Sequence, residues 1–334
     1  MTDTTGGSHA LRVGIIGCGD AARRVHLPRL EAAGAEVIRF ASADLADAEA
    51  AAAVAQHEAM ATNDWRKVVT SPHIDAVDIC TPSHLHAEMA LAALDAGKHV
   101  LVESPMALTV RDADSLLKAA ARKERMVVPA HSVRFIGPYR ALAEAARSGK
   151  VGTVTGAFAE FGHQGPDHLY PGAGWYLQQA RSGGGALMDL GVPLVDLLRL
   201  ATGSEPVEAT ATISGQRGEV ETRAEVGLQF ASGAVAHIIA GWEGPANLIQ
   251  IEGSEGTLRL DDRGARFLRP DGSEERLRPS EDGPDGIESV FVAAVTGGTP
   301  TVNALDGRAA VATVLAAYES ARTGAAVNVP SPAW

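Results

Sequence analysis

Three small residues near the N-terminus have the spacing of a phosphate-binding turn. The segment VGIIGCGDAARR places Gly17, Gly19 and Ala22 in the pattern G-x-G-x-x-G/A, after an apolar run and at the start of a helix-compatible stretch. The first glycine permits a tight bend, the second lets a pyrophosphate approach the backbone, and Ala22 permits close packing of helix on strand. We expect a dinucleotide to bind this turn, through Gly17, Gly19, Asp20, Ala21 and Ala22. A glycine turn without a ligand is the alternative.

The next apolar run, EVIRFAS, bears on which dinucleotide binds. An acid at the end of the second strand of such a unit bonds the ribose 2′-hydroxyl of NAD, whereas a neutral residue leaves room for the 2′-phosphate of NADP. Ser42 falls at this position, with Asp44 two residues beyond it, where it can cap the following helix. The sequence therefore favours NADP over NAD, although no arginine follows Ser42 directly.

A second segment with chemical potential runs from residue 183 to 200, GGGALMDLGVPLVDLLRL. Its leucines recur at spacings of three and four, which predicts an amphipathic helix. Pro193 lies inside this pattern, where a proline removes a backbone donor and costs about 3 kcal/mol. Two acids, Asp189 and Asp196, flank the proline, and three glycines precede it. This combination needs an explanation other than helix stability.

The elements that would position these residues fall into two groups. From residue 11 to 131, short apolar strands alternate with helical stretches, which predicts an α/β domain, a doubly wound parallel sheet of the Rossmann type. Residues 132–334 are expected to form an α+β domain, because several alternating strands there follow one another at hairpin spacing, as in a large, mostly antiparallel open sheet. A last helix near 306–322 could return to the first domain. Residues 1–10 are expected to be a disordered tail.

The bulk properties exclude several classes of function. The chain has 334 residues and a formal net charge of −12, which argues against nucleic-acid or anionic-membrane partners. No apolar run approaches the roughly 20 residues that span a bilayer. Two cysteines far apart in sequence, Cys18 and Cys80, are expected to be free thiols, which suggests a cytoplasmic protein. His84 and His86 are two apart and do not share a helix face, and no group has zinc spacing, so no metal is expected.

In these motifs the sequence resembles the glucose–fructose oxidoreductase, inositol dehydrogenase and rhizopine catabolism (Gfo/Idh/MocA) family. ICTPSHLHAEMALAALDAGKHVLVES is similar to that family's Thr-Pro segment, helix and Glu-Lys-Pro strand, and WYLQQARSGGGALMDLGVPLVDLL is similar to its glycines followed by Asp-x-Gly-x-His-x-x-Asp. The resemblance implies an N-terminal Rossmann domain, a C-terminal α/β domain whose open sheet forms a homodimer or homotetramer, and hydride transfer between a nicotinamide and a hydroxyl-bearing carbon of a sugar or cyclitol. The N-terminal segment is closest to the NADP-dependent sugar ketoreductase branch.

Two departures from the family pattern affect the chemistry that the resemblance implies. The lysine of Glu-Lys-Pro is Ser104 here, and the histidine of the later motif is Pro193, whereas Asp189, Gly191 and Asp196 match. In the family these two residues handle the proton of the substrate hydroxyl. A positioned acid or base contributes about 10²–10⁴-fold to such a reaction, and neither proline nor an unassisted serine can supply it.

The resemblance also indicates which side chains line the site. Asp189 is the first candidate for a replacement proton carrier, because burial beside a cofactor can raise the pKa of an aspartate into a useful range. Glu103 and Ser104 should face the nicotinamide cleft. The loop before the glycines offers further candidates, namely His163, Asp167, His168, Tyr170 and Tyr176. The remaining residues expected near the cofactor are Thr81, Pro82, His86, Glu103 and Arg134, although capping or packing would also explain His86.

Three interpretations remain open from the sequence. In the first, redox chemistry persists with a relocated acid. In the second, the chain binds a dinucleotide and catalyses an elimination, epimerisation or rearrangement without net redox change. In the third, it is a nucleotide-binding homologue without catalytic activity.

Overall fold

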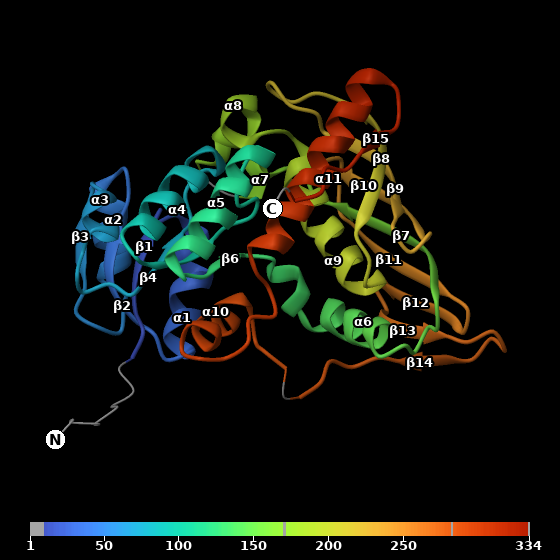
Figure 1. Cartoon of the computed structure of the whole chain (residues 1–334), viewed down its shortest axis with the longest axis horizontal. Helices are drawn as coiled ribbons and strands as arrows, with labels where there is room; N and C mark the ends of the chain where they lie inside the picture. The colour runs from blue at the N-terminus through green and yellow to red at the C-terminus, as the bar shows by residue number, and fades with distance from the viewer. Residues whose placement is uncertain (1–9, 170–171, 282, 333–334) are drawn as a thin grey trace.

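The computed structural model describes residues 10–169, 172–281 and 283–332. Two parts of the sequence for which we stated an expectation lie outside the described residues, namely residues 1–9 of the expected tail and Tyr170. The described chain forms two sheets side by side, the first in the blue half of Figure 1 and the second in the yellow and orange half.

The first sheet has six strands, all parallel, in the order β3-β2-β1-β4-β5-β6. This is the doubly wound Rossmann order, as expected. Its strands are β1 (Arg12–Ile16), β2 (Glu36–Ala41), β3 (Met60–Thr62), β4 (Ala76–Ile79), β5 (His99–Val102) and β6 (Val127–Pro129). Five of the six carry a buried apolar run that predicts them, whereas β3 has three residues and none of them is buried.

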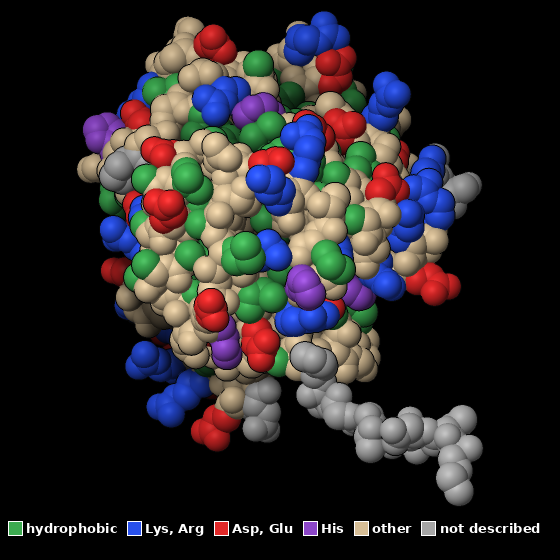
Figure 2. Space-filling view, turned by 90° about the vertical axis from the view of Figure 1, so that its left-hand side faces the viewer, with side chains coloured by type: hydrophobic (Ala, Val, Ile, Leu, Met, Phe, Trp, Pro, Cys, Tyr) green, Lys and Arg blue, Asp and Glu red, His purple; other side chains and the backbone are tan. Residues whose placement is uncertain are grey.

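Helices connect these strands and cover the sheet. They are α1 (Leu27–Ala32), α2 (Leu45–Ala52), α3 (Arg66–Val69), α4 (His86–Asp95) and α5 (Val110–Lys123). Asp44 caps α2 by accepting the N–H of Ala46 at 3.0 Å, which confirms the capping prediction. On the face of this domain seen in Figure 2, acidic and basic side chains are interspersed.

The second sheet has nine strands in the order β14-β13-β12-β11-β7-β10-β9-β8-β15. All neighbouring pairs are antiparallel except β7 and β10. The strands are β7 (Val154–Gly162), β8 (Pro206–Ser214), β9 (Arg223–Phe230), β10 (Val235–Gly241), β11 (Ala246–Gly253), β12 (Gly256–Asp261), β13 (Gly264–Leu268), β14 (Glu274–Arg276) and β15 (Val327–Asn328). The predicted mostly antiparallel sheet is therefore present.

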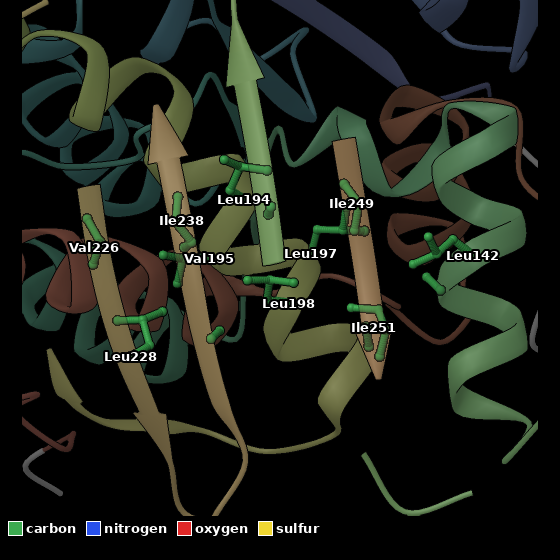
Figure 3. Close-up of a cluster of buried hydrophobic side chains, with 14 of the residues drawn as sticks. Leu142, Leu194, Val195, Leu197, Leu198, Val226, Leu228, Ile238, Ile249 and Ile251 are labelled. Atoms are coloured by element: carbon green, nitrogen blue, oxygen red, sulfur yellow. The ribbon is translucent and has the colours of Figure 1, made fainter. Parts of the chain in front are cut away.

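The helices of the second half lie on the side of this sheet that faces the first domain (Figure 1). They are α6 (Gly137–Arg147), α7 (Pro166–Leu169), α8 (Gln179–Ser182), α9 (Val192–Thr202), α10 (Ile287–Val295) and α11 (Ala304–Thr323). Figure 3 shows Leu194, Leu197 and Leu198 of α9 among the apolar side chains of β9, β10 and β11. The predicted leucine face is the one that is buried.

Two of these helices also contact the first domain. α10 packs on α1, and its Ile287 and Phe291 belong to the same buried cluster as Val13 and Ile15 of β1. α11 lies against α5 and β6 on one side and against α9 and β8 on the other. No helix of the described chain combines the length and apolarity needed to cross a membrane.

Candidate active site

The carboxyl ends of β1, β4 and β5 meet at one edge of the parallel sheet. Gly17 follows β1, Thr81 and Pro82 follow β4 after Cys80, and Glu103 follows β5 directly. β1 and β4 are neighbours in the sheet but their connections run in opposite directions, which makes this the topological switch point where ligands of such folds bind.

The two glycines of the turn have different physical roles. Gly17 has φ of +91°, and a Cβ at this position would lie 2.6 Å from the carbonyl carbon of Cys80, so only glycine fits. At Gly19 an added Cβ would meet no atom within 4 Å. The chain therefore needs Gly17 for its own packing, whereas the open space over Gly19 suits the close approach of a pyrophosphate. The residues present fit a dinucleotide.

The neighbouring residues complete this cradle. A helical segment begins at Asp20, and its first turns run through Ala21 into the π-helix η1 (Ala22–His26). Ala22 is buried, as close helix packing requires. The carboxylate of Asp20 faces Arg24 at 3.3 Å and thus compensates a cation at the mouth of the turn. Ser42 directly follows β2.

His86 was expected near the cofactor, with capping or packing as the alternative, and in the structure its ring is packed between two loops. Its ring is 1 % exposed, with Nε2 2.6 Å from the carbonyl oxygen of Thr81 and Nδ1 2.8 Å from that of Pro105. Burial lowers the pKa of His86, against the effect of these carbonyl groups. The neutral ring has one N–H, which donates to one of these two backbone oxygens, and the ring packs between the loops after β4 and β5.

Glu103 belongs to a buried chain of ionisable groups that the sequence did not reveal. Nδ1 of His26 lies 3.0 Å from Asp78 Oδ2, and Nε2 lies 2.7 Å from Glu103 Oε1. Burial lowers the pKa of His26, but the charge of Asp78, its hydrogen bond and the neighbouring Cys80 together outweigh that effect and hold the pKa well above its usual range. The other oxygen of Glu103 accepts the N–H of Ser104 at 2.9 Å. Both oxygens are thus occupied, and Glu103 orients the Ser104 turn.

The predicted catalytic residues converge where the two domains meet. A small cavity has Ser83, Ser104 and Pro105 on the Rossmann side, and its opposite wall consists of Tyr176, Ser182, Gly184, Met188 and Asp189. The peptide bond between Ser104 and Pro105 is cis. The hydroxyl of Ser104 is buried and makes no hydrogen bond within the described residues. It is therefore available to a bound molecule.

Asp189 is held by two donors that bind the same oxygen. Nε2 of His163 and the indole Nε1 of Trp242 each lie 2.9 Å from Asp189 Oδ2. The N–H of Gly165 donates to Nδ1 of His163 at 2.9 Å, so the ring is the neutral tautomer that carries its proton on Nε2. Oδ1 of Asp189 has no hydrogen-bond partner in the described part of the chain. This oxygen can accept a proton or a hydroxyl hydrogen from a molecule in the cavity.

Comparison with known proteins supports this assignment of the two halves. Residues 11–131 match the model of an oxidoreductase family with an NAD-binding Rossmann fold, and residues 139–259 match the Gfo/Idh/MocA C-terminal domain. The chain belongs to the Gfo/Idh/MocA family. The chemistry of this family is oxidoreduction with a nicotinamide dinucleotide, and this chain is a member of it in sequence and in fold.

Three similar proteins of the family act on sugars. The 1,5-anhydro-D-fructose reductase of Ensifer adhaerens is 31% identical, over 95% of this chain and 98% of the relative. The aldose-aldose oxidoreductase of Caulobacter crescentus, solved with glycerol, has a TM-score of 0.84 at 26% identity, covering 96% of this chain and 100% of that one. A levoglucosan dehydrogenase solved with NADH and levoglucosan has a TM-score of 0.82 at 25% identity, covering 97% and 100%.

Pro193 was expected in the interior of a helix over residues 183–200, but it lies near the start of α9. The segment does not form one regular helix from residue 183, because residues Leu187–Gly191 form a π-helical turn, η5, and α9 begins at Val192. Pro193 is thus in the first turn of α9, where a missing N–H is tolerated. Asp189 lies within the π turn, a local irregularity often found at functional sites.

Two of the three glycines before Asp189 make room for a side chain and for a backbone carbonyl group. A Cβ on Gly184 would lie 2.0 Å from the hydroxyl of Tyr318, and one on Gly185 would lie 1.9 Å from the carbonyl oxygen of Glu221. The carboxylate of Glu221 accepts the N–H of Gly185 and of Leu187, and also the Tyr318 hydroxyl at 2.7 Å. Burial and this carboxylate hold the pKa of Tyr318 well above its usual range, so it remains a donor. This network fixes the turn that carries Asp189.

Arg134 does not face the cofactor, contrary to expectation. Its guanidinium is 6% exposed and forms two hydrogen bonds of 2.5 Å with Asp196, while Asp306 lies at 3.1 Å. The side chain therefore joins the segment after β6 to α9 and α11. Asp196, which matches the family motif, acts here as the partner of this arginine.

Four residues that shape the site were not identified as functional from the sequence. Asp78 is an acid within the buried strand β4, an anomaly that could have pointed to a buried cationic partner such as His26. Trp242 is 2% exposed, and its N–H donates to Asp189. Glu221 and Tyr318 lie far from the motifs in sequence, and nothing in their surroundings distinguishes them.

Proposed function

We propose that this chain is an NAD(P)-dependent oxidoreductase that interconverts a hydroxyl and a carbonyl group on a sugar or cyclitol, with Asp189 as its proton-transfer group. The observation that supports this best is the arrangement at Asp189, where His163 and Trp242 occupy one carboxylate oxygen and the other is left for a ligand. The family relationship supports the reaction class, and the sugar-active relatives support the substrate class.

The residues of the chain divide the work as follows. When bound, the dinucleotide supplies the acceptor or donor of the hydride. As the C–H bond of the alcohol breaks, Asp189 takes the hydroxyl proton through Oδ1, and the C–O bond becomes a carbonyl. His163 and Trp242 keep the carboxylate oriented by donating to Oδ2. The Asp189 side chain is 19% exposed, so the proton can exchange with solvent. In the reverse direction Asp189 returns it.

Ser104 and Tyr176 bind the substrate in this proposal. The buried Ser104 hydroxyl donates to the substrate oxygen without transferring its proton, because a serine hydroxyl is too weak an acid near neutral pH. Tyr176, stacked on Trp175 with ring centroids 3.8 Å apart, forms the opposite wall. Glu103 acts indirectly, by holding the N–H of Ser104.

We infer a preference for NADP over NAD from the end of β2. Ser42 is the neutral residue there, and the carboxylate of Asp44 is already engaged as the cap of α2, so it does not reach the ribose in this arrangement. Replacing Ser42 with aspartate should therefore shift the ratio of the two dissociation constants toward NAD by about tenfold.

We also propose that the chain assembles as a homodimer or homotetramer through the outer face of the nine-stranded sheet, and that it works in the cytoplasm. Val235 of β10 is 58% exposed and alternates with the buried Ala236 and Ile238, so its apolar side chain lies on this outer face. Light scattering of the wild type and of Val235→Glu tests the assembly, which the charge should weaken.

Nucleotide titration followed by a substrate panel tests the enzymatic proposal. The purified chain should bind NADP⁺ with a dissociation constant below about 1 mM and should reduce it in the presence of at least one sugar or cyclitol. No binding at millimolar nucleotide would overturn the proposal. Binding without turnover of any compound in the panel, together with consumption of a sugar intermediate at constant nucleotide absorbance, would instead favour non-redox chemistry.

A further inference from the structure

Asp189 is a carboxylate without a charged partner in the described part of the chain. Its two donors, Trp242 and His163, are both neutral, because the His163 ring accepts the N–H of Gly165 on Nδ1. No lysine or arginine of the described residues forms an ion pair with Asp189. The negative charge of this side chain is therefore balanced by dipoles alone, and it acts on any molecule in the neighbouring cavity.

The cavity that Asp189 lines holds no positive charge that could offset this carboxylate. One of its walls is the carboxyl edge of the parallel sheet, with Ser83 after β4 and Ser104 after β5, and Asp189 belongs to the opposite wall. Among the described residues that line the cavity, none is a lysine, an arginine or a histidine. Ser104 occupies the position at which the family pattern has a lysine. A ligand at this edge of the sheet, where ligands of such folds bind, therefore faces an unbalanced carboxylate.

The groups next to Ser104 add further negative charge. The side chain of Glu103 is 30% exposed. Burial raises the pKa of Glu103, but the hydrogen bond and the charge of His26 outweigh that effect and hold the pKa below its usual range. His26 also faces Asp78, so two carboxylates share one imidazolium. Both sides of the cavity are thus negative.

The two redox forms of a nicotinamide dinucleotide differ in the charge of the ring that reacts. The oxidised ring is a cation and the reduced ring is neutral, whereas the phosphate groups are the same in both forms. In the proposed reaction the substrate carbon approaches the ring to about 3–3.5 Å, and its oxygen binds Asp189. The ring and the carboxylate are then separated by one functional group, and opposite charges this close attract each other strongly in a partly buried site.

We infer that Asp189 makes this site bind the oxidised coenzyme more tightly than the reduced one, and that it thereby favours carbonyl reduction on the enzyme. In that direction the hydride passes from the reduced coenzyme to the carbonyl carbon, and Asp189 gives its proton to the carbonyl oxygen. Two neutral groups become a pair of opposite charges, which the site stabilises. The inference rests on the proposed function, because that reaction places the ring beside Asp189.

Equilibrium titration without substrate tests this preference. NADPH binding is followed by its fluorescence at pH 8, above the usual titration range of a carboxylic acid, and NADP⁺ is measured by competition. In Asp189→Asn we expect NADP⁺ to bind on the order of tenfold more weakly and NADPH to bind as before. The ratio of the two dissociation constants should change by the same factor, which is about 30 mV in the potential of the bound couple.

Two further variants sharpen the titration. Ser104→Lys places an ammonium group on the wall opposite Asp189 and should also weaken NADP⁺ on the order of tenfold while leaving NADPH unchanged. Glu243→Gln is the matched control, because it removes a carboxylate that directly follows Trp242 but is 57% exposed and lies 3.5 Å from Arg223. This control should leave the ratio unchanged.

The outcomes separate this inference from the proposed function. A ratio in Asp189→Asn within twofold of the wild type overturns the inference, as does an equal change in Glu243→Gln, and neither result affects the proton-transfer role. A tenfold change in the ratio together with an unaltered kcat in Asp189→Asn supports the electrostatic preference and overturns proton transfer by Asp189. If neither form of the coenzyme binds at millimolar concentration, both proposals fail.

Discussion

Two histidine–carboxylate pairs lie on either side of the interdomain cavity, and they differ in what their neighbours leave free. His26 is 2% exposed and has a carboxylate at each ring nitrogen, so its geometry is satisfied only by the imidazolium. The side chain of His163 is 24% exposed and accepts an N–H on one nitrogen, so it is the neutral ring. The same two residue types thus make a fixed ion in one place and a carboxylate with a free oxygen in the other.

The comparison shows that the role of a carboxylate depends less on residue type than on whether both of its oxygens already have hydrogen-bond partners. Both oxygens of Asp78 and of Glu103 have partners, His26 and Cys80 for Asp78, and His26 and the backbone N–H of Ser104 for Glu103. Asp189 has both of its donors on Oδ2. Four substitutions should separate the two pairs further.

Asp189→Asn should have the largest effect. The amide keeps the shape but cannot accept the hydroxyl proton, so we expect kcat to fall by about 10²–10⁴-fold, the usual contribution of a positioned acid or base. The dissociation constant for NADPH, measured by titration, should stay within about twofold. An unchanged kcat would show that another group carries the proton.

His26→Leu should destabilise the fold rather than the chemistry. The change leaves Asp78, which is fully buried, without its cationic partner. Breaking a buried ion pair in this way costs about 3–5 kcal/mol. Urea unfolding of the nucleotide-free protein measures the loss. A change below about 1 kcal/mol would contradict an ionised His26.

The pH dependence of stability should identify the same residue. The pKa of His26 is higher in the folded protein than in the unfolded chain. Its contribution to the free energy of unfolding is therefore complete at pH values below the unfolded pKa, and it is lost as the pH rises through the folded pKa. The free energy of unfolding of the wild type should therefore fall above neutral pH, by at most about 1.4 kcal/mol per pH unit from this group. In His26→Leu the part of this pH dependence that comes from His26 should be absent. A slope equal to that of the wild type would show that His26 does not contribute to it.

His163→Phe should have the smallest effect. The ring can still stack on Trp242, but it no longer donates to Asp189, which retains the indole N–H. We expect kcat to fall by about tenfold, the effect of one hydrogen bond to a charged group, with less than about 1 kcal/mol lost in stability. His163→Gln, which can restore a donor, should recover part of the activity. Equal losses in both variants would point to packing instead.

Much of the fold follows from local patterns. The glycine turn, the alternation of strands and helices and the leucine spacing of α9 are each encoded within about 20 residues, and all of them are present. The parts that could not be predicted depend on contacts between distant segments. Glycines on both sides mark the ends of α10, but its sequence does not say which surface it covers, and its place on α1 is decided by the buried Phe291.

The same distinction applies to the site. Asp189, Ser104 and Tyr176 could be placed together because they lie in recognisable motifs, and the cavity contains all three. Arg134 and His86 were expected at the cofactor because of their positions after β6 and β4. Their actual partners, Asp196 and two backbone carbonyl groups, depend on tertiary packing that residue spacing does not reveal.

The placement of α10 has a consequence for how the protein is made. Three apolar residues of α10 complete the buried cluster beneath β1, although they are synthesised roughly 270 residues after it, namely Ile287, Val290 and Phe291. The nucleotide-binding lobe therefore cannot finish folding while the ribosome is still translating the second sheet. Residues 11–131 expressed alone would expose the apolar surface that α10 covers, so we expect this isolated domain to aggregate.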